Sequence, residues 1–374
     1  MEPEQVTITV LLPDMFKAFL KQEPLVNPHY ERVKLESEEW LSEFCSFGPR
    51  MRKKVNNCDF SYFCAIAAPF APRSQFRTIC DWGNWVFPYD DMFDNGCLRD
   101  KPEESQRVME SLMMPMMGKS SYLDVADRLR IVQAHDTVFQ RIAMPLHIKG
   151  VRKRFALAMQ GYCQGALVQI DNHFASKTPS LEEIVLIRRK SAGCKPLYHL
   201  VEYAHDLRVP DEVFDNPVIQ ELECLGMDMA EGVPHNMVTV CCSSGMSLQN
   251  AFNTVGKLLE QRYQRWDKAE ASVPSWGKEA DVQVRKYVEG IKCVVKANLN
   301  WSFKSERYLG SNPAQVRSTR VLQLLVESPN SRRKTVVMKH HHSRLQDDAL
   351  KTVGSYIIWI YTLAIEFLLS CVMY

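Results

Sequence analysis

The stretch FPYDDMFD, residues 87–94, places three carboxylates within five positions, directly behind a run of aromatic side chains. Asp90 and Asp94 are four residues apart, so on a helix they share a face, and Asp91 lies one step around from them. Unpaired carboxylates this close repel one another, and apolar surroundings make the repulsion costly unless a cation neutralises it. Mg²⁺ suits such a cluster, because it typically binds one or two carboxylates together with a substrate phosphate. The alternative is an acidic helix turn that faces water, since short acidic clusters are common on surfaces.

Two clusters of cationic side chains follow further along the chain. The run IRRKSAG, residues 187–193, contains three consecutive cations. Arginine suits a diphosphate because its planar guanidinium donates two parallel hydrogen bonds and stays charged. The run WSFKSERYLG, residues 301–310, offers a fixed cation in Arg307 and a neutral donor in Tyr308. Each cluster alone also fits a simpler role, as a surface patch or as an arginine near a helix end.

The composition excludes some classes of function. Positive and negative side chains nearly cancel over the 374 residues, with a formal net charge of +2, so nothing indicates a nucleic-acid-binding surface. The 12 cysteines are scattered without a Cys-x-x-Cys pair, which is typical of reduced thiols in an intracellular protein. The first residues include two glutamates and no basic region, so we expect no secretory signal and a cytoplasmic protein.

Helical periodicity dominates the chain. Apolar residues recur at helical spacing in long segments, and we see no β-type alternation of any length and no internal repeat. The pattern predicts a single all-α domain of packed helices over residues 1–325, followed by a divergent tail over residues 326–374. The segments expected to be helical are 33–47, an aromatic helix that ends in the aspartates, 105–117, 122–142, 151–177, 181–204, 216–230, 247–266 and 281–306.

In this order, the aspartate cluster and the two basic clusters resemble those of class I terpene synthases, and specifically of fungal, basidiomycete-type sesquiterpene synthases. The resemblance covers about residues 12–325. It implies a helical bundle around a central apolar, aromatic-lined pocket, in which Mg²⁺ and basic residues hold the diphosphate of farnesyl diphosphate. Ionisation then gives an allylic cation that cyclises. Further short motifs that support the resemblance are LPD at 12–14, NPHY at 27–30, HN at 235–236 and SLQ at 247–249.

The resemblance also implies roles for individual residues. Asp90, with Asp91 and Asp94, would be metal ligands or their immediate support. Arg189 would be the diphosphate sensor, and Gly193 would supply the backbone carbonyl that helps to trigger ionisation.

Further residues are implied for the diphosphate and for the pocket. Arg307 and Tyr308 would hold the diphosphate. Lys190 follows the sensor arginine at a position where relatives commonly have an aspartate. The aromatic candidates for the pocket are Trp82, Phe87, Trp301 and Phe303.

One motif of the family is missing. Relatives carry a second magnesium motif, an Asn, a Ser and a Glu at four-residue intervals, shortly before the His-Asn pair. Here the segment before that pair reads LGMDMAEGVP, residues 225–234, so the Asn-Ser-Glu motif is absent, as if it had been deleted. Asp228, Gly232 and Asn236 have the same spacing and are candidates for a substitute site, but Gly232 and Pro234 would disrupt the helix.

The missing motif leaves two principal hypotheses open. The first is an active sesquiterpene synthase with a substitute metal site. The second is a catalytically inactive relative that at most binds a prenyl diphosphate. A chain-elongating prenyltransferase is disfavoured, because the sequence has no second aspartate-rich motif.

The tail has its own pattern. Residues 328–348 are polar and basic, whereas residues 356–373 are almost continuously apolar, at the lower limit of length for crossing a bilayer. Membrane association through 356–373 is one hypothesis, and an apolar helix packed on the domain, or an error in gene prediction, is the other.

Overall fold

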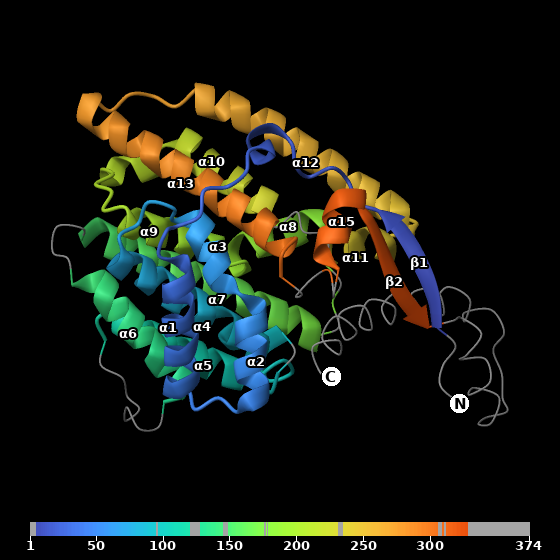
Figure 1. Cartoon of the computed structure of the whole chain (residues 1–374), viewed down its shortest axis with the longest axis horizontal. Helices are drawn as coiled ribbons and strands as arrows, with labels where there is room; N and C mark the ends of the chain where they lie inside the picture. The colour runs from blue at the N-terminus through green and yellow to red at the C-terminus, as the bar shows by residue number, and fades with distance from the viewer. Residues whose placement is uncertain are drawn as a thin grey trace. The chain divides into compact units, whose positions relative to one another are not determined.

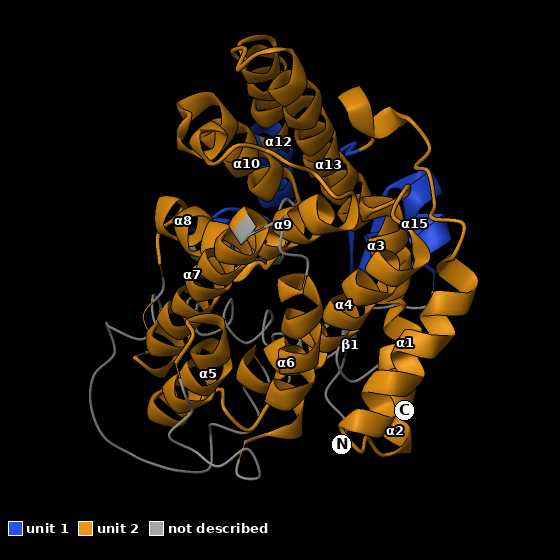
Figure 2. Ribbon diagram, turned by 90° about the vertical axis from the view of Figure 1, so that its left-hand side faces the viewer, with its two compact units in different colours: residues 1–15, 234–258, 302–374 blue, residues 16–233, 259–301 orange. Residues whose placement is uncertain are grey.

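Helices form most of the regular structure that the computed structural model describes (Figure 1), which confirms the predicted all-α class. The described residues are 5–94, 96–119, 128–144, 149–175, 177, 179–230, 235–305, 309 and 312–327. They divide into two compact units, coloured separately in Figure 2. The larger unit comprises residues 16–233 and 259–301, and the smaller unit comprises residues 1–15, 234–258 and 302–374.

Most helices of the larger unit lie where the periodicity predicts them, although α2 and α3 were not predicted as separate helices. Short 3-10 helices are present at Ala18–Lys21 and Asp211–Asp215. The α-helices are α1 (Tyr30–Phe44), α2 (Pro49–Cys58), α3 (Phe60–Ala67), α4 (Arg73–Asp94), α5 (Pro102–Met116), α6 (Arg130–Ala143), α7 (Lys149–Phe174), α8 (Leu181–Ser191), α9 (Cys194–Ala204), α10 (Pro217–Ala230), most of α12 (Leu248–Ala271) and α13 (Lys278–Ser302).

Helix α4, which carries the aspartates at its C-terminal end, is held on several sides. It packs against α1, α3, α6 and α9. Trp82, Trp85 and Tyr89 are at most 1% exposed, so this face of the helix is fully buried. The Trp85 indole nitrogen Nε1 donates a 2.6 Å hydrogen bond to the backbone carbonyl of Ile131, which satisfies a buried donor. Burial of three large aromatic rings on one helix face fixes the direction in which the opposite face points.

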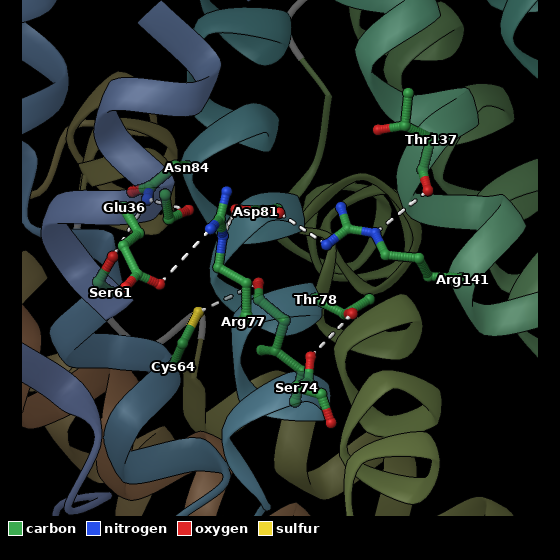
Figure 3. Close-up of polar contacts among 12 residues, drawn as sticks. Glu36, Ser61, Cys64, Ser74, Arg77, Thr78, Asp81, Asn84, Thr137 and Arg141 are labelled. Carbon is green, nitrogen blue, oxygen red and sulfur yellow. Dashed lines mark hydrogen bonds and ion pairs between the residues drawn. The ribbon is translucent and has the colours of Figure 1, made fainter. Parts of the chain in front are cut away.

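A buried ion cluster in the first half of α4 adds to this restraint (Figure 3). Asp81, whose side chain is 1% exposed, accepts hydrogen bonds of 2.7 Å from Arg77 Nε and from Arg141 Nη1. Arg77 also lies 3.7 Å from Glu36 on α1. A buried carboxylate is tolerated only when it is paired, and here the pairing joins α4 to α6 and α1.

The segment 181–204 is two helices, so the prediction of one helix was wrong. The break falls at Gly193, whose φ of +73° lies in the left-handed region that favours glycine. Helix α8 begins with a capping box in which Ser180 and Glu183 bond each other's backbone N–H groups. A Cβ atom added at Gly193 would lie 3.7 Å from the Trp82 ring, so the break contacts α4.

The smaller unit contains β1 (Gln5–Leu11), β2 (Val321–Glu327), α11 (His235–Ser243) and α15 (Pro313–Thr319). The expectation of no strand was therefore wrong. The two strands pair antiparallel, with Gln5 opposite Glu327 and Leu11 opposite Val321. The run VTITV in β1 alternates apolar and polar residues, which is the signal that marks a strand. Strand β2 extends past residue 325, where the tail was expected to begin.

The SLQ motif supports the end of β1. The Gln249 side chain accepts a 2.8 Å hydrogen bond from the Leu11 backbone N–H and donates a 2.9 Å bond to the Leu11 carbonyl. Gln249 thereby satisfies both backbone groups of Leu11, as a neighbouring strand would.

No helix within the described ranges combines the length and the apolar character needed to cross a membrane. The hypothesis of a membrane tail concerns residues 356–373, which lie outside the described residues.

Candidate active site

Asp90 is hydrogen-bonded to a neighbouring helix. Its Oδ1 accepts a 2.7 Å hydrogen bond from the Tyr162 hydroxyl on α7. Burial, helped by the nearby negative charge of Asp94, raises the pKa of Asp90 to about 8, although the Tyr162 hydrogen bond and the positive charge of Arg188 oppose the rise. The effect of Arg188 shows that a cation of α8 lies near the aspartate end of α4.

The other two carboxylates have different surroundings. Asp91 Oδ2 lies 2.8 Å from Lys54 Nζ on α2, with the two side chains 12% and 27% exposed. Asp94 is exposed at the end of α4. The structure thus joins Asp90 to α7 and Asp91 to α2, while Asp94 lies at the surface.

The described residues supply an incomplete set of metal ligands. Among them, no three His, Cys, Asp or Glu side chains are grouped closely enough to hold a metal ion. Mg²⁺ commonly takes one or two carboxylates from the protein and completes its octahedron with water and substrate phosphate. Asp90 and Asp94 fit that kind of site, because they are two carboxylates one helix turn apart whose negative charges act on each other. Asp90 and Asp94 would hold the ion, which when bound would neutralise developing negative charge on a diphosphate.

Arg189 makes a two-point ion pair with Asp228 in the last turn of α10. Its Nε and Nη2 donate hydrogen bonds of 2.7 and 2.8 Å to the two carboxylate oxygens. Arg262 on α12 adds a 3.1 Å hydrogen bond to Asp228 Oδ2. Asp228, a candidate for the substitute metal site, is therefore bonded to two arginines. Glu231 and Gly232 lie outside the described residues, as does the Asn236 side chain.

Four aromatic rings gather beside the aspartate end of α4. Phe87 stacks on Trp301 with 5.2 Å between ring centroids, and Phe60 contacts both rings edge-on at 4.6 and 5.2 Å. Phe63 stacks on Phe60 at 4.4 Å. The Trp301 indole donates a 2.7 Å hydrogen bond to the carbonyl of Cys58, which fixes its ring. Aromatic faces of this kind stabilise a nearby cation.

The other residues predicted to line the pocket or to hold the diphosphate lie in different parts of the chain. Trp82 faces Trp85 and Phe155, at 6.1 and 6.5 Å, and is separate from the Phe87 cluster. Phe303 is buried in the smaller unit. Arg307 and Tyr308 lie outside the described residues, so their roles stay predictions.

Sequence reasoning missed Phe60, Lys54, Tyr162 and Arg262. Phe60 and Phe63 have the three-residue spacing of a helix face, which was the available signal. The other three are polar residues on predicted or overlooked helices, and their partners are distant in sequence. No local pattern marks them.

A predominantly helical bundle with an aspartate-rich helix end, an arginine beside a helix break and an aromatic cluster is typical of the class I terpenoid synthase fold. Solved structures agree. Wild-type cucumene synthase matches with a TM-score of 0.66 and 18% identity, covering 75% of this chain and 97% of that one. The structure of a-eudesmol synthase matches with a TM-score of 0.67 and 19% identity, covering 76% and 97%.

Sequence comparisons give the family. A family model described as "Terpene synthase family 2, C-terminal metal binding" matches residues 81–265. Silphinene synthase of Penicillium patulum is 35% identical over 336 residues, which cover 85% of this chain and 90% of that protein. The (+)-eremophilene synthase of Gibberella fujikuroi is 30% identical, covering 84% and 92%. The chain belongs to the terpene synthase family, and its class of activity is that of a terpene cyclase.

Proposed function

We propose that this protein is a sesquiterpene synthase that ionises farnesyl diphosphate with the help of Mg²⁺, cyclises the cation and releases diphosphate. The observation that carries the proposal is the position of Asp90 at the end of α4, where Tyr162 holds it by a 2.7 Å hydrogen bond and the positive charge of Arg188 on α8 acts on it. Phe87, one turn before Asp90, lies in the aromatic cluster. A metal clamp, a basic group and a cation-stabilising surface are the three parts that such a reaction needs.

Each group has a defined task in the proposed reaction. The allylic C–O bond breaks, and its electron pair leaves with the diphosphate. Arg189 would donate hydrogen bonds to the departing diphosphate oxygens, where negative charge develops. The faces of Phe87, Phe60 and Trp301 would stabilise the allylic cation and exclude water from it. Loss of a proton from the cyclised cation then gives a neutral hydrocarbon.

Mg²⁺ is proposed on the basis of ligand chemistry. The matching family is described as metal-binding, and the carboxylate oxygens of Asp90 and Asp94 are the ligands that Mg²⁺ prefers. Farnesyl diphosphate is proposed from the resemblance to fungal sesquiterpene synthases.

The test is a product assay with purified protein. Farnesyl, geranyl and geranylgeranyl diphosphates are each incubated with protein and MgCl₂, and the volatile and hexane-soluble hydrocarbons are identified by mass spectrometry. We expect a cyclic C15 hydrocarbon from farnesyl diphosphate, absent with heat-killed protein and with EDTA. Absence of any product from all three substrates would favour the inactive relative that the missing Asn-Ser-Glu motif suggests. Product from another chain length would correct the substrate.

A further inference from the structure

Asp228, in the last turn of α10, binds arginines from two other helices. The carboxylate is the most buried member of the cluster, since its side chain is 6% exposed, compared with 27% for Arg189 and 18% for Arg262. Arg189 bonds both carboxylate oxygens, and Arg262 adds a third hydrogen bond. A carboxylate has about four acceptor sites, and the arginines take three of them, so few are left for a metal ion.

The pairing occupies one edge of the Arg189 guanidinium. Asp228 takes the edge formed by Nε and Nη2, so the edge formed by Nη1 and Nη2 points away from the carboxylate. The Arg189 side chain is 27% exposed, so part of it is accessible to a ligand. A guanidinium edge can donate two parallel hydrogen bonds to phosphate oxygens.

The charge balance of the cluster favours an anion. One carboxylate cannot neutralise two guanidinium groups, so the cluster formed by Asp228, Arg189 and Arg262 keeps a net positive charge. Such a cluster attracts a diphosphate and repels a divalent cation.

The helix turn that carries Asp228 is itself restrained. Asn298 on α13 donates a hydrogen bond to the backbone carbonyl of Ala230, two residues beyond Asp228. Carbonyls at a helix C-terminus lack intrahelical partners, so this bond fixes the end of α10. A fixed carboxylate can in turn fix the direction of a long arginine side chain.

We propose that Asp228 is a positioning residue that aims Arg189 at the diphosphate, with Arg262 holding Asp228 from the other side, and that Asp228 is not a ligand of a second metal ion. The proposal rests on the proposed function for the identity of the ligand. It deepens that function by naming what orients the arginine in a chain that lacks the Asn-Ser-Glu motif.

The test measures the binding of pyrophosphate and the binding of a metal ion separately, in the full chain. Inorganic pyrophosphate binding in the presence of Mg²⁺ is measured by calorimetry, and Mn²⁺ binding without pyrophosphate is measured by electron paramagnetic resonance. The variants are Asp228→Asn, Asp228→Glu and the matched control Glu221→Gln. Glu221 pairs with Arg265 across the same two helices, α10 and α12, at 2.5 Å, but both side chains are more exposed.

We expect Asp228→Asn to weaken pyrophosphate binding by about tenfold, the usual effect of losing one charged hydrogen-bond pair. Mn²⁺ affinity should stay within about twofold of wild type, the usual spread for a distant, independent site. Asp228→Glu keeps the charge and should lose less pyrophosphate affinity, and Glu221→Gln should lose none. Thermal unfolding followed by circular dichroism establishes whether each variant is folded. If Asp228→Asn does not fold, the comparison of Asp228→Glu with wild type is used as the test.

Two other results would overturn the proposal in distinguishable ways. A lower Mn²⁺ affinity in Asp228→Asn would identify Asp228 as a metal ligand. Pyrophosphate binding equal to wild type in both Asp228 variants would show that Arg189 needs no positioning by this residue. The first two results would leave the proposed function intact. Absence of pyrophosphate binding in the wild-type protein would contradict the proposed function as well.

Discussion

The hydroxyl group of Tyr162 donates a 2.7 Å hydrogen bond to Oδ1 of Asp90, which joins the middle of α7 to the aspartate-rich end of α4. Tyr162 is 2% exposed, so the bond is sheltered from water on the tyrosine side. Loss of a side chain that orients a metal ligand typically lowers metal affinity by roughly 10–100-fold. The contact therefore predicts that Tyr162 sets the direction of the carboxylate most suited to hold Mg²⁺.

Replacing Tyr162 with Phe tests this role, because it removes the hydroxyl and keeps the ring. We expect Mn²⁺ affinity to fall by about tenfold, with little change in the melting temperature. Tyr198→Phe is the control, because that buried hydroxyl bonds the backbone carbonyl of Glu223. Equal metal affinity in Tyr162→Phe and wild type would show that Asp90 needs no such support.

His135 makes the fold sensitive to acid. The residue is fully buried between Trp85 and Phe155, and among the described residues neither ring nitrogen has a hydrogen-bond partner. Burial, with a contribution from the charge of Arg128, lowers the pKa of His135 from 6.5 to about 3. The folded protein therefore holds this imidazole neutral at pH values where the unfolded chain protonates it.

The sign of the effect follows from linkage. Below about pH 6.5 the unfolded state binds a proton that the folded state does not, so stability falls as pH decreases towards about 3. The loss is about 1.4 kcal/mol per pH unit over this window. Urea unfolding at pH 7, 6 and 5 should show this additional slope in wild type and lose it in His135→Leu. The same pH dependence in both proteins would contradict the assignment.

Gly193 is required by its backbone conformation and not by lack of space. Its φ is +73°, and an added Cβ would meet the Trp82 ring only at an ordinary 3.7 Å. Gly193→Ala should therefore destabilise the fold by about 1 kcal/mol or more and disturb the break between α8 and α9. Gly161→Ala is the matched control, since Gly161 lies in α7 with no atom within 4 Å of the added Cβ. The control should be stabilised by about 0.5–1 kcal/mol. Two equal melting temperatures would contradict this prediction.

The apolar tail offers a prediction about location in the cell. If residues 356–373 associate with membranes, the full chain should appear in the membrane fraction of lysed cells, and a chain that ends at residue 327 should not. The comparison uses immunoblots of both fractions. Recovery of both chains in the soluble fraction would exclude the tail as an anchor and agree with the cytoplasmic prediction.

Local patterns predicted the parts of the fold that depend on local physics. The helical periodicity of apolar residues and the four-residue spacing of Asp90 and Asp94 are visible in the sequence. The structure places both aspartates in the last turns of α4. The break at Gly193 was missed because the apolar periodicity continues across it, while the glycine changes only the backbone direction. Strand β1 was missed although VTITV alternates, because its partner strand lies more than 300 residues away.

The site depended mainly on contacts that no local pattern encodes. Tyr162 is 72 residues from Asp90, and Arg189 is 39 residues from Asp228. Each of these residues looks ordinary on its own helix, and only the packing of the helices brings the partners together. The sequence therefore nominated the carboxylates and Arg189 as candidates, but not the side chains that contact them.

The central claim is that the carboxylate of Asp90 and the guanidinium of Arg189 act on one diphosphate, and a double-mutant cycle tests it most directly. Pyrophosphate binding in the presence of Mg²⁺ is measured for wild type, Asp90→Asn, Arg189→Gln and the double variant. The account predicts that the two losses are not additive, with a coupling free energy of about 1 kcal/mol or more. Strictly additive losses, or no loss in either single variant, would contradict it.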